Sequence, residues 1–176
     1  MTLFQHDQFT DIPEQSRPLL EKSLNTYGWI PNQNAVMAAS PALLEAYQKA
    51  NDLFLASSFN DTEKATVWIA TGIAQHCDYT IKAHQFIAQK SNVNPDVIKA
   101  IVTGDALSNR LHALRELTLK MASNPSLVIS DDILTFISAG FDKKQVCEVI
   151  LAVAQKTMSN IMNNLAKTPI DEVFNS

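Results

Sequence analysis

The sequence predicts an all-α protein, a single-domain bundle of about eight helices joined by short loops. Its 176 residues suffice for one buried core, and 46% hydrophobic with 18% charged residues is typical of a globular domain. The chain has only 4 Gly, and the strict alternation of apolar and polar residues that marks strands is absent. Helix-capping residues and prolines instead recur along its length, which favours helices with short connections.

The helices expected in the first third of the chain are defined by their ends. An apolar-periodic stretch follows Pro13, runs to Tyr27 and stops at Gly28. A short helix is expected over residues 33–39. Ser40 and Pro41 then provide an N-cap followed by proline at the first helical position, which opens a helix through residue 55.

Further helices are expected along the rest of the chain. Asn60 and Glu63 have capping-box spacing, and so have Asp142 and Gln145 at the start of the last helix. Apolar residues in that long helix recur at i, i+3 and i+4 steps, which indicates one buried face. In order, the expected segments are 60–74, 77–90, 94–104, 108–123, 130–140 and 142–168.

The charge and composition exclude several classes of protein. The formal net charge is -4 and the basic residues are scattered, so neither a nucleic-acid partner nor a membrane surface is expected. No signal peptide and no apolar run of membrane-spanning length is visible, which predicts a cytoplasmic protein with reduced cysteines. His6 and His112 have no partners in sequence and are interpreted as surface residues. We expect no metal ion and no cofactor.

One helix carries the candidate catalytic residues Cys77, Thr80 and His84. At 3.6 residues per turn they share a face, so a thiol, a hydroxyl and an imidazole can line one pocket. A helix N-terminus or a nearby imidazolium favours the thiolate, the form of cysteine that attacks peroxides and disulfides. His84 lies two turns from Cys77, so we expect the proton to pass between them through Thr80 or a water molecule. The alternative interpretation is that Cys77 only packs, as buried cysteines often do.

The Cys77 segment resembles the signature of the carboxymuconolactone decarboxylase superfamily, in its alkylhydroperoxidase D-like branch. In that signature, Cys-x-x-Cys-x-x-x-His, the first cysteine corresponds to Cys77 and the histidine to His84. Further similarity lies in residues 110–118 with 124–125, in 139–149, and in 159–160 with 168–169.

The resemblance implies an alkylhydroperoxidase D-like helical fold that assembles into homo-oligomers, either trimers or hexamers. It also implies a superfamily core over residues 60–176, on which the helices of residues 1–59 pack within one domain. Active members reduce peroxides with the cysteine pair, a glutamate and the histidine. Thr80 replaces the second cysteine here, and Ala65 stands at the position of the glutamate. Glu63 is rotated by about 200° from that position and is not a simple replacement.

Three functions remain open from the sequence, and whether the protein is an enzyme remains open with them. The first is thiol-dependent peroxide reduction through Cys77, with an external thiol reductant or Cys147 as the resolving group. The second is a degenerate family member without redox turnover that acts as a binding or structural protein. The third is a cofactor-free decarboxylase or lactone-acid lyase that uses His84, so the expected substrate is a small peroxide or acid.

Two further groups of residues have a functional and a structural interpretation. Cys147 lies among aliphatic residues, so its simplest interpretation is packing. Asn160, Asn163 and Asn164 could line a pocket at the last helix, or could form a polar helix face near its end.

Overall fold

The computed structural model describes residues 12–175, and this part of the chain contains nine α-helices and no strand. The predicted all-α class is therefore confirmed, with one helix more than the count of about eight. The helices are α1 (Arg17–Tyr27), α2 (Asn32–Met37), α3 (Pro41–Leu55), α4 (Asp61–Ala74), α5 (Asp78–Lys90), α6 (Pro95–Thr103), α7 (Asn109–Ser123), α8 (Ser130–Ser138) and α9 (Lys143–Ala166). Short 3-10 turns cover Glu14–Ser16, Pro125–Leu127 and Glu172–Asn175.

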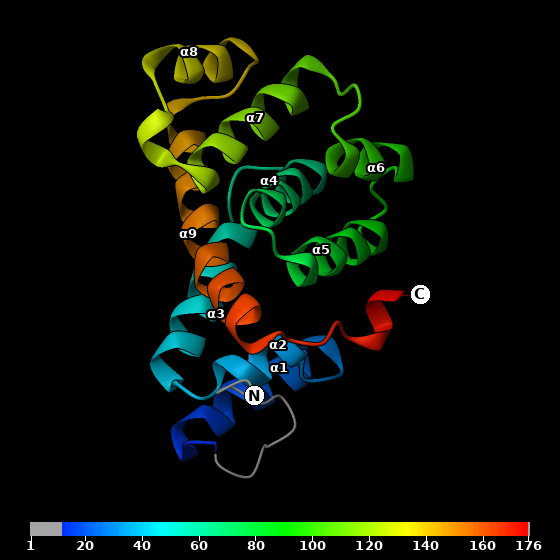
Figure 1. Ribbon diagram of the computed structural model, residues 1–176, viewed down its shortest axis with the longest axis vertical. Coiled ribbons are helices and arrows are strands. Elements are labelled where there is room, and N and C mark those ends of the chain that lie inside the picture. The colour runs from blue at the N-terminus through cyan, green and yellow to red at the C-terminus, as the bar shows by residue number, and fades with distance from the viewer. Residues whose placement is uncertain (1–11, 176) are drawn as a thin grey trace.

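The long helix α9 runs lengthwise along one side of the molecule in the view of Figure 1, and α2, α3, α4, α5 and α7 pack against it. Its N-terminal half packs with α4, α7 and α8 around an aromatic and aliphatic core that includes Phe54, Trp68, Phe136 and Val149. Its C-terminal half packs with α1, α2 and α3 around a second core that includes Leu20, Met37, Leu44 and Met162. The two halves of α9 thus pack into two different parts of the core.

The predicted caps agree with the structure in most places. Both capping boxes form, at Asn60–Glu63 and at Asp142–Gln145. The helix predicted over 33–39 occupies Asn32–Met37, and the helix predicted after Pro13 begins with a 3-10 turn before α1. Ser130 is the first residue of α8 rather than its cap, because the Ile129 N–H donates to Asp132 Oδ2 at 2.9 Å.

The turn between α4 and α5 fixes the start of the candidate site. The N–H of His76 donates to Ile73 O at 3.2 Å and that of Cys77 to Gly72 O at 2.9 Å, which is a Schellman ending of α4. His76 takes the left-handed conformation, with φ 50°, that glycine usually supplies. Cys77 then has extended dihedrals and is the N-cap of α5. The helix expected from about Cys77 therefore begins at Asp78, with Cys77 as its N-cap.

Gly72 permits the close approach of α4 and α5. A Cβ at this position would lie 3.0 Å from Thr80 Cγ2 and 3.1 Å from Ile81 Cγ1. These distances are shorter than ordinary carbon–carbon contacts, so a larger residue would push the helices apart. The small residue thus brings the side chains of α5 against α4 and the core.

The segment after α9 returns across the molecule and contacts α5 and the α1–α2 connection (Figure 1). Buried Asp171 accepts hydrogen bonds from Trp29 Nε1 at 3.2 Å, from Asn32 N at 3.1 Å, and from the Tyr79 hydroxyl. Phe174 packs edge-on against the rings of Trp29 and Tyr79 and tilted against a further ring. We predicted only a short tail here, because these partners lie more than ninety positions away in sequence.

Within residues 12–175, no helix has both the length and the apolar character needed to cross a bilayer.

Asp171→Asn should loosen the C-terminal segment while leaving the helical core intact. Loss of the carboxylate charge weakens its bonds to three donors, so we expect the free energy of unfolding to fall by about 1–3 kcal/mol. Amide hydrogen exchange should accelerate over residues 168–175. The exposed neighbour Glu172 provides the matched control, Glu172→Gln. Equal exchange in both variants would contradict the role given to Asp171.

Candidate functional site

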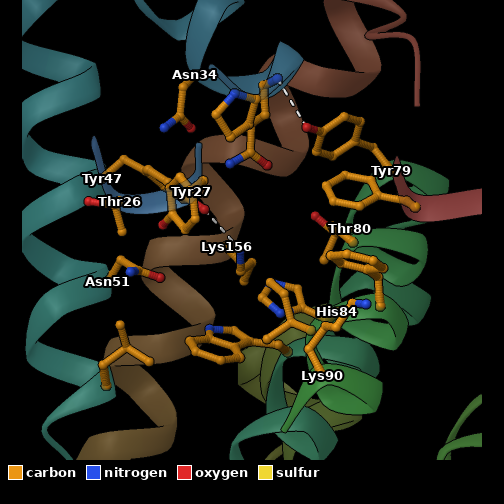
Figure 2. A pocket seen from close by; sticks show the side chains of 18 of the residues that line it. Thr26, Tyr27, Asn34, Tyr47, Asn51, Tyr79, Thr80, His84, Lys90 and Lys156 are labelled. Carbon is orange, nitrogen blue, oxygen red and sulfur yellow. Dashed lines mark hydrogen bonds between the residues drawn. The ribbon is translucent and has the colours of Figure 1, made fainter. Parts of the chain in front are cut away.

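The structure contains a cavity of about 390 Å³ between α3, α5, α9 and the α1–α2 connection (Figure 2). Its walls are rich in aromatic rings. Partly or fully exposed residues mark the mouth, and buried polar side chains lie inside. The lining residues used below are Tyr27, Gln33, Tyr47, Trp68, Tyr79, Thr80, His84, Phe86, Ile87, Lys90, Lys156 and Phe174.

Lys156 is the most unusual residue of the cavity, because its side chain is only 2% exposed. Its amine donates a hydrogen bond to the Tyr47 hydroxyl at 3.0 Å, and lies 5.2 Å from the Tyr47 ring centre and 5.7 Å from that of Trp68. It forms no ion pair with a carboxylate of residues 12–175. Burial therefore lowers the pKa of Lys156 to about 7, and the Cys77 sulfur opposes this shift.

His84 is held against the indole of Trp68. The two rings stack with centres 4.5 Å apart and planes inclined by 24°. The indole is fixed in turn, because Trp68 Nε1 donates to Gln155 Oε1 of α9 at 3.1 Å. Burial, with a smaller contribution from the Lys156 charge, lowers the pKa of His84 well below its usual value. Its Nδ1 atom is buried without a hydrogen-bond partner among the described residues.

Tyr47 on α3 completes this group, and burial raises the pKa of its hydroxyl to about 12. The described residues that line the cavity include Lys90, Lys156 and His84 but no aspartate or glutamate. A negatively charged or electron-rich ligand would therefore meet cationic and hydrogen-bonding groups without a competing carboxylate. Figure 2 shows the Lys156 amine between Tyr47 on one side and His84 on the other.

The predicted trio of Cys77, Thr80 and His84 is divided by the structure. Thr80 and His84 line the cavity, whereas Cys77 is not among its lining residues. The helical face was misjudged at Cys77, because an N-cap has extended dihedrals and its side chain does not follow the helical rotation. Cys77 is fully buried and borders a separate depression of about 310 Å³ at the α4–α5 turn. Asn163 Nδ2 donates to its sulfur at 3.8 Å.

Thr80 is engaged in a hydrogen-bond network rather than in the expected relay. Its hydroxyl donates to Asn160 Oδ1 at 2.6 Å, and Asn160 Nδ2 donates to Gln75 Oε1 at 2.8 Å. Asn163 Nδ2 donates to Gln33 Oε1 at 2.9 Å. Asn160 and Asn163 are buried and support cavity residues without lining the cavity, whereas Asn164 is exposed and holds the Gln75 carbonyl at 3.1 Å.

The remaining candidates do not complete a two-cysteine site within one chain. Cys147 is exposed, so its interpretation as a packing residue is wrong. It precedes Asn163 by sixteen positions on α9, about 24 Å along the helix at about 1.5 Å per residue, so Cys77 is out of disulfide reach. Ala65 and His84 both line a small cavity of about 50 Å³, in which Asp61 is the one acid among the described lining residues. Glu63 is occupied elsewhere, since its Oε1 accepts from Arg110 Nε at 2.7 Å.

Two further histidines were interpreted as surface residues from the sequence. His112 is exposed as predicted, and His6 lies outside the described residues. Within residues 12–175, no cluster of His, Cys, Asp and Glu side chains could hold a metal ion.

Sequence reasoning missed Lys156 and Tyr47. A lysine in a long helix is usually exposed, so its type gives no warning of burial. One signal was available: Lys156 precedes Asn160 by four residues and Asn163 by seven, so the three share a face of α9. Because the apolar residues of α9 lie on more than one side, this polar stripe did not stand out as an inward face.

The fold is that of the alkylhydroperoxidase AhpD core, as comparison with solved structures shows. One match is an uncharacterized peroxidase-related protein from Ralstonia eutropha JMP134, with a TM-score of 0.84 and 20% identity over 98% of this chain and 94% of that chain. Another is a peroxidase-related protein from Silicibacter sp. TM1040, with a TM-score of 0.82 and 17% identity over 98% of this chain and 92% of that chain.

A third match is the debrominase Bmp8, as a cysteine-to-alanine variant in complex with 2,3,4-tribromopyrrole. Its TM-score is 0.82 at 16% identity, over 99% of this chain and 95% of that chain. No family model matches the sequence, and no curated protein matches it. At these identities the comparisons confirm the alkylhydroperoxidase D-like fold and do not extend to activity.

Lys156→Met should make the protein more stable at pH 6.5 by about 2–4 kcal/mol, because it removes the cost of burying an amine that prefers to be charged. In the unfolded chain this lysine stays protonated up to about pH 10, whereas in the folded protein it loses its proton near pH 7. The stability of the wild type therefore rises with pH between these values, and the advantage of the variant should shrink towards pH 10. Urea unfolding of the wild type and the variant between pH 6.5 and about pH 10 measures both stabilities. A pH-independent difference would contradict the burial of an ionisable amine.

Proposed function

We propose that this protein binds a small, planar organic acid in the aromatic cavity and promotes a non-redox proton transfer on it. The observation that carries the proposal is the combination of one neutral imidazole and one low-pKa amine in a ring-lined cavity without carboxylates. The volume of about 390 Å³ lies at the lower end of the range of small-molecule sites. This function corresponds to the lyase alternative of the superfamily.

A proton acceptor, His84, and a proton donor, Tyr47, support this chemistry. Because the pKa of His84 is well below its usual value, the imidazole is neutral at physiological pH, and its buried Nδ1 has no hydrogen-bond partner among the described residues. Because the pKa of Tyr47 is about 12, its hydroxyl keeps its proton and can donate it. A ligand between them would meet a proton acceptor and a proton donor at the same pH.

The charge distribution indicates how an acid would be attracted. Lys90 is exposed at the mouth, with its amine 5.2 Å from the Phe86 ring centre, and Lys156 lies inside. The debrominase of the same fold was solved with a brominated pyrrole, which supports a flat, electron-rich ring as the body of the ligand.

Benzoate should bind in this cavity and take up protons as it binds. A carboxylate near Lys156 favours the ammonium form, so binding at pH 7.5 should transfer a fraction of a proton from the buffer to the protein. Calorimetry in two buffers of different ionisation enthalpy measures this uptake. Lys156→Met should abolish it and weaken binding by about ten-fold, whereas the exposed Lys143→Met on the same helix should not change either quantity.

Absence of benzoate binding by the wild type would contradict the proposed ligand class. For the reaction, a panel of lactone acids tests turnover, and His84→Gln should reduce it strongly while leaving benzoate affinity within a few-fold. Turnover equal in wild type and His84→Gln would remove His84 from the mechanism.

A second candidate is thiol-dependent peroxide reduction at Cys77, which one specific observation favours. The sulfur lies at the N-terminus of α5, 3.8 Å from an amide donor of Asn163, and beside a surface depression that also contains Lys167. The thiolate would attack the peroxide oxygen and give a sulfenic acid and an alcohol. One external thiol would form a mixed disulfide and water, and a second would release Cys77 with a disulfide product.

Peroxide consumption with varied small thiols tests this candidate. Cys77→Ser should lose all thiol-dependent consumption, whereas Cys147→Ser should keep it, because only Cys77 is positioned at a helix N-terminus. Equal rates in the wild type and Cys77→Ser would exclude the peroxidase candidate. A protein that fails in this assay and in the lactone-acid assay, yet binds benzoate, would be the non-catalytic binding member.

A further inference from the structure

The position of Lys156 requires an explanation beyond ligand attraction. Some other lysines of the described chain pair with acids, as Lys22 does with Asp52 at 2.7 Å and Lys120 with Asp132 at 2.6 Å. Lys156 has only a phenol as hydrogen-bond partner and is almost fully buried. An ammonium group so placed is unfavourable, whereas an uncharged amine is tolerated well by rings and a hydroxyl. The surroundings therefore favour the form of lysine that carries a lone pair.

We propose that Lys156 is the nucleophile of a carbonyl-binding site, where its amine forms a reversible imine with an aldehyde or ketone held in the aromatic cavity. The inference rests on the proposed function in one respect, because it requires that a small molecule enter this cavity. To that function the inference adds a covalent step, imine formation, and it narrows the ligand class to aldehydes and ketones.

The protonation state supplies the nucleophile. With its pKa at about 7, roughly half of Lys156 is unprotonated at neutral pH. For an exposed lysine the corresponding fraction is roughly one in a few thousand. Desolvation of a lysine in an apolar pocket is a recognised way of activating it towards carbonyl groups.

The groups around Lys156 can manage the protons of this step. The nitrogen lone pair attacks the carbonyl carbon, the C=O π electrons move to the oxygen, and one nitrogen proton passes to that oxygen to give a carbinolamine. The Tyr47 hydroxyl, 3.0 Å from the amine, then protonates the departing hydroxyl group, which leaves as water while the C=N bond forms. The second nitrogen proton returns to the Tyr47 phenolate, so one water is released for each imine.

The cavity also indicates the body of the carbonyl compound. The rings of Trp68, Tyr79, Phe86 and Phe174 form flat walls, and no carboxylate among the described lining residues would repel an acid group. Lys90 at the mouth can pair with a carboxylate at the far end of the molecule, while the carbonyl carbon faces Lys156 inside. A planar aldehyde or ketone that carries a carboxylate fits both requirements.

Reductive trapping tests the proposal directly. The full-length protein is incubated with 4-carboxybenzaldehyde and sodium cyanoborohydride, which delivers hydride to the imine carbon and makes the bond permanent. Intact mass gives the stoichiometry, and peptide mapping gives the modified lysine. We expect saturable labelling at Lys156, at least about ten-fold above any exposed lysine at pH 7.5, with a pH midpoint near 7 rather than near 10.

Lys156→Arg is the matched variant, because arginine keeps a positive charge and lacks a nucleophilic amine. It should lose the saturable label, whereas Lys143→Arg at the exposed start of α9 should retain it. Circular dichroism and thermal unfolding establish that each variant is folded. The site mapping and pH profile of the wild type need no variant, so the proposal stays testable if Lys156→Arg does not fold.

The outcomes separate this inference from the proposed function. Label spread evenly over exposed lysines, with benzoate still binding in the cavity, overturns the imine and leaves the proposed function standing. Failure of both benzoate binding and Lys156 labelling overturns both. Label at Lys156 whose formation benzoate prevents competitively supports both.

Discussion

The contact between Lys156 and Tyr47 joins two helices, and much of the cavity depends on the same packing of α9 against α3 and α5. Along its inward face α9 presents a polar stripe to an otherwise apolar bundle, and each member of this stripe needs a partner because unpaired buried polar groups are costly. Asn160 and Asn163 find theirs in Thr80 and Gln33, and Gln155 holds the Trp68 indole. Lys156, the one charged residue named in this stripe, has the Tyr47 hydroxyl and no carboxylate as partner among the described residues, and it lines the cavity.

This arrangement separates two sites that a helical wheel would merge. The thiol lies at the turn between α4 and α5, behind the start of the helix, and the imidazole lies two turns further, inside the aromatic cavity. Thr80, which was expected to assist the thiol, donates to Asn160 instead. Glu63, which was not expected to replace the missing glutamate, caps α4 and pairs with Arg110. The chain therefore has the fold of the alkylhydroperoxidase core, and His84 and Tyr47 lie on either side of the Lys156 amine in its cavity.

Local signals in the sequence were sufficient for most of the fold. Capping boxes at Asn60 and Asp142 and the proline after Ser40 are written in residues three or four positions apart, and the structure has them where predicted. The site was harder, because its geometry depends on contacts between distant segments. Tyr47 and Lys156 are separated by 109 positions and Trp68 and Gln155 by 87, and neither pair leaves a mark in a local pattern. Cys77 was misplaced for a smaller reason, since one residue of difference at a helix start changes where its side chain points.

The anchoring of Asp171 to Trp29 has a consequence for the order in which the molecule is built. The two residues are 142 positions apart, whereas the α4–α5 hairpin that carries His84 is a purely local structure. Contacts that close so long a loop carry a large entropic cost and form after the segments between them are compact. We therefore expect the polar and aromatic interior to exist first as an open trough, and to become an enclosed chamber only in the last stage of folding, when Phe174 settles against its rim.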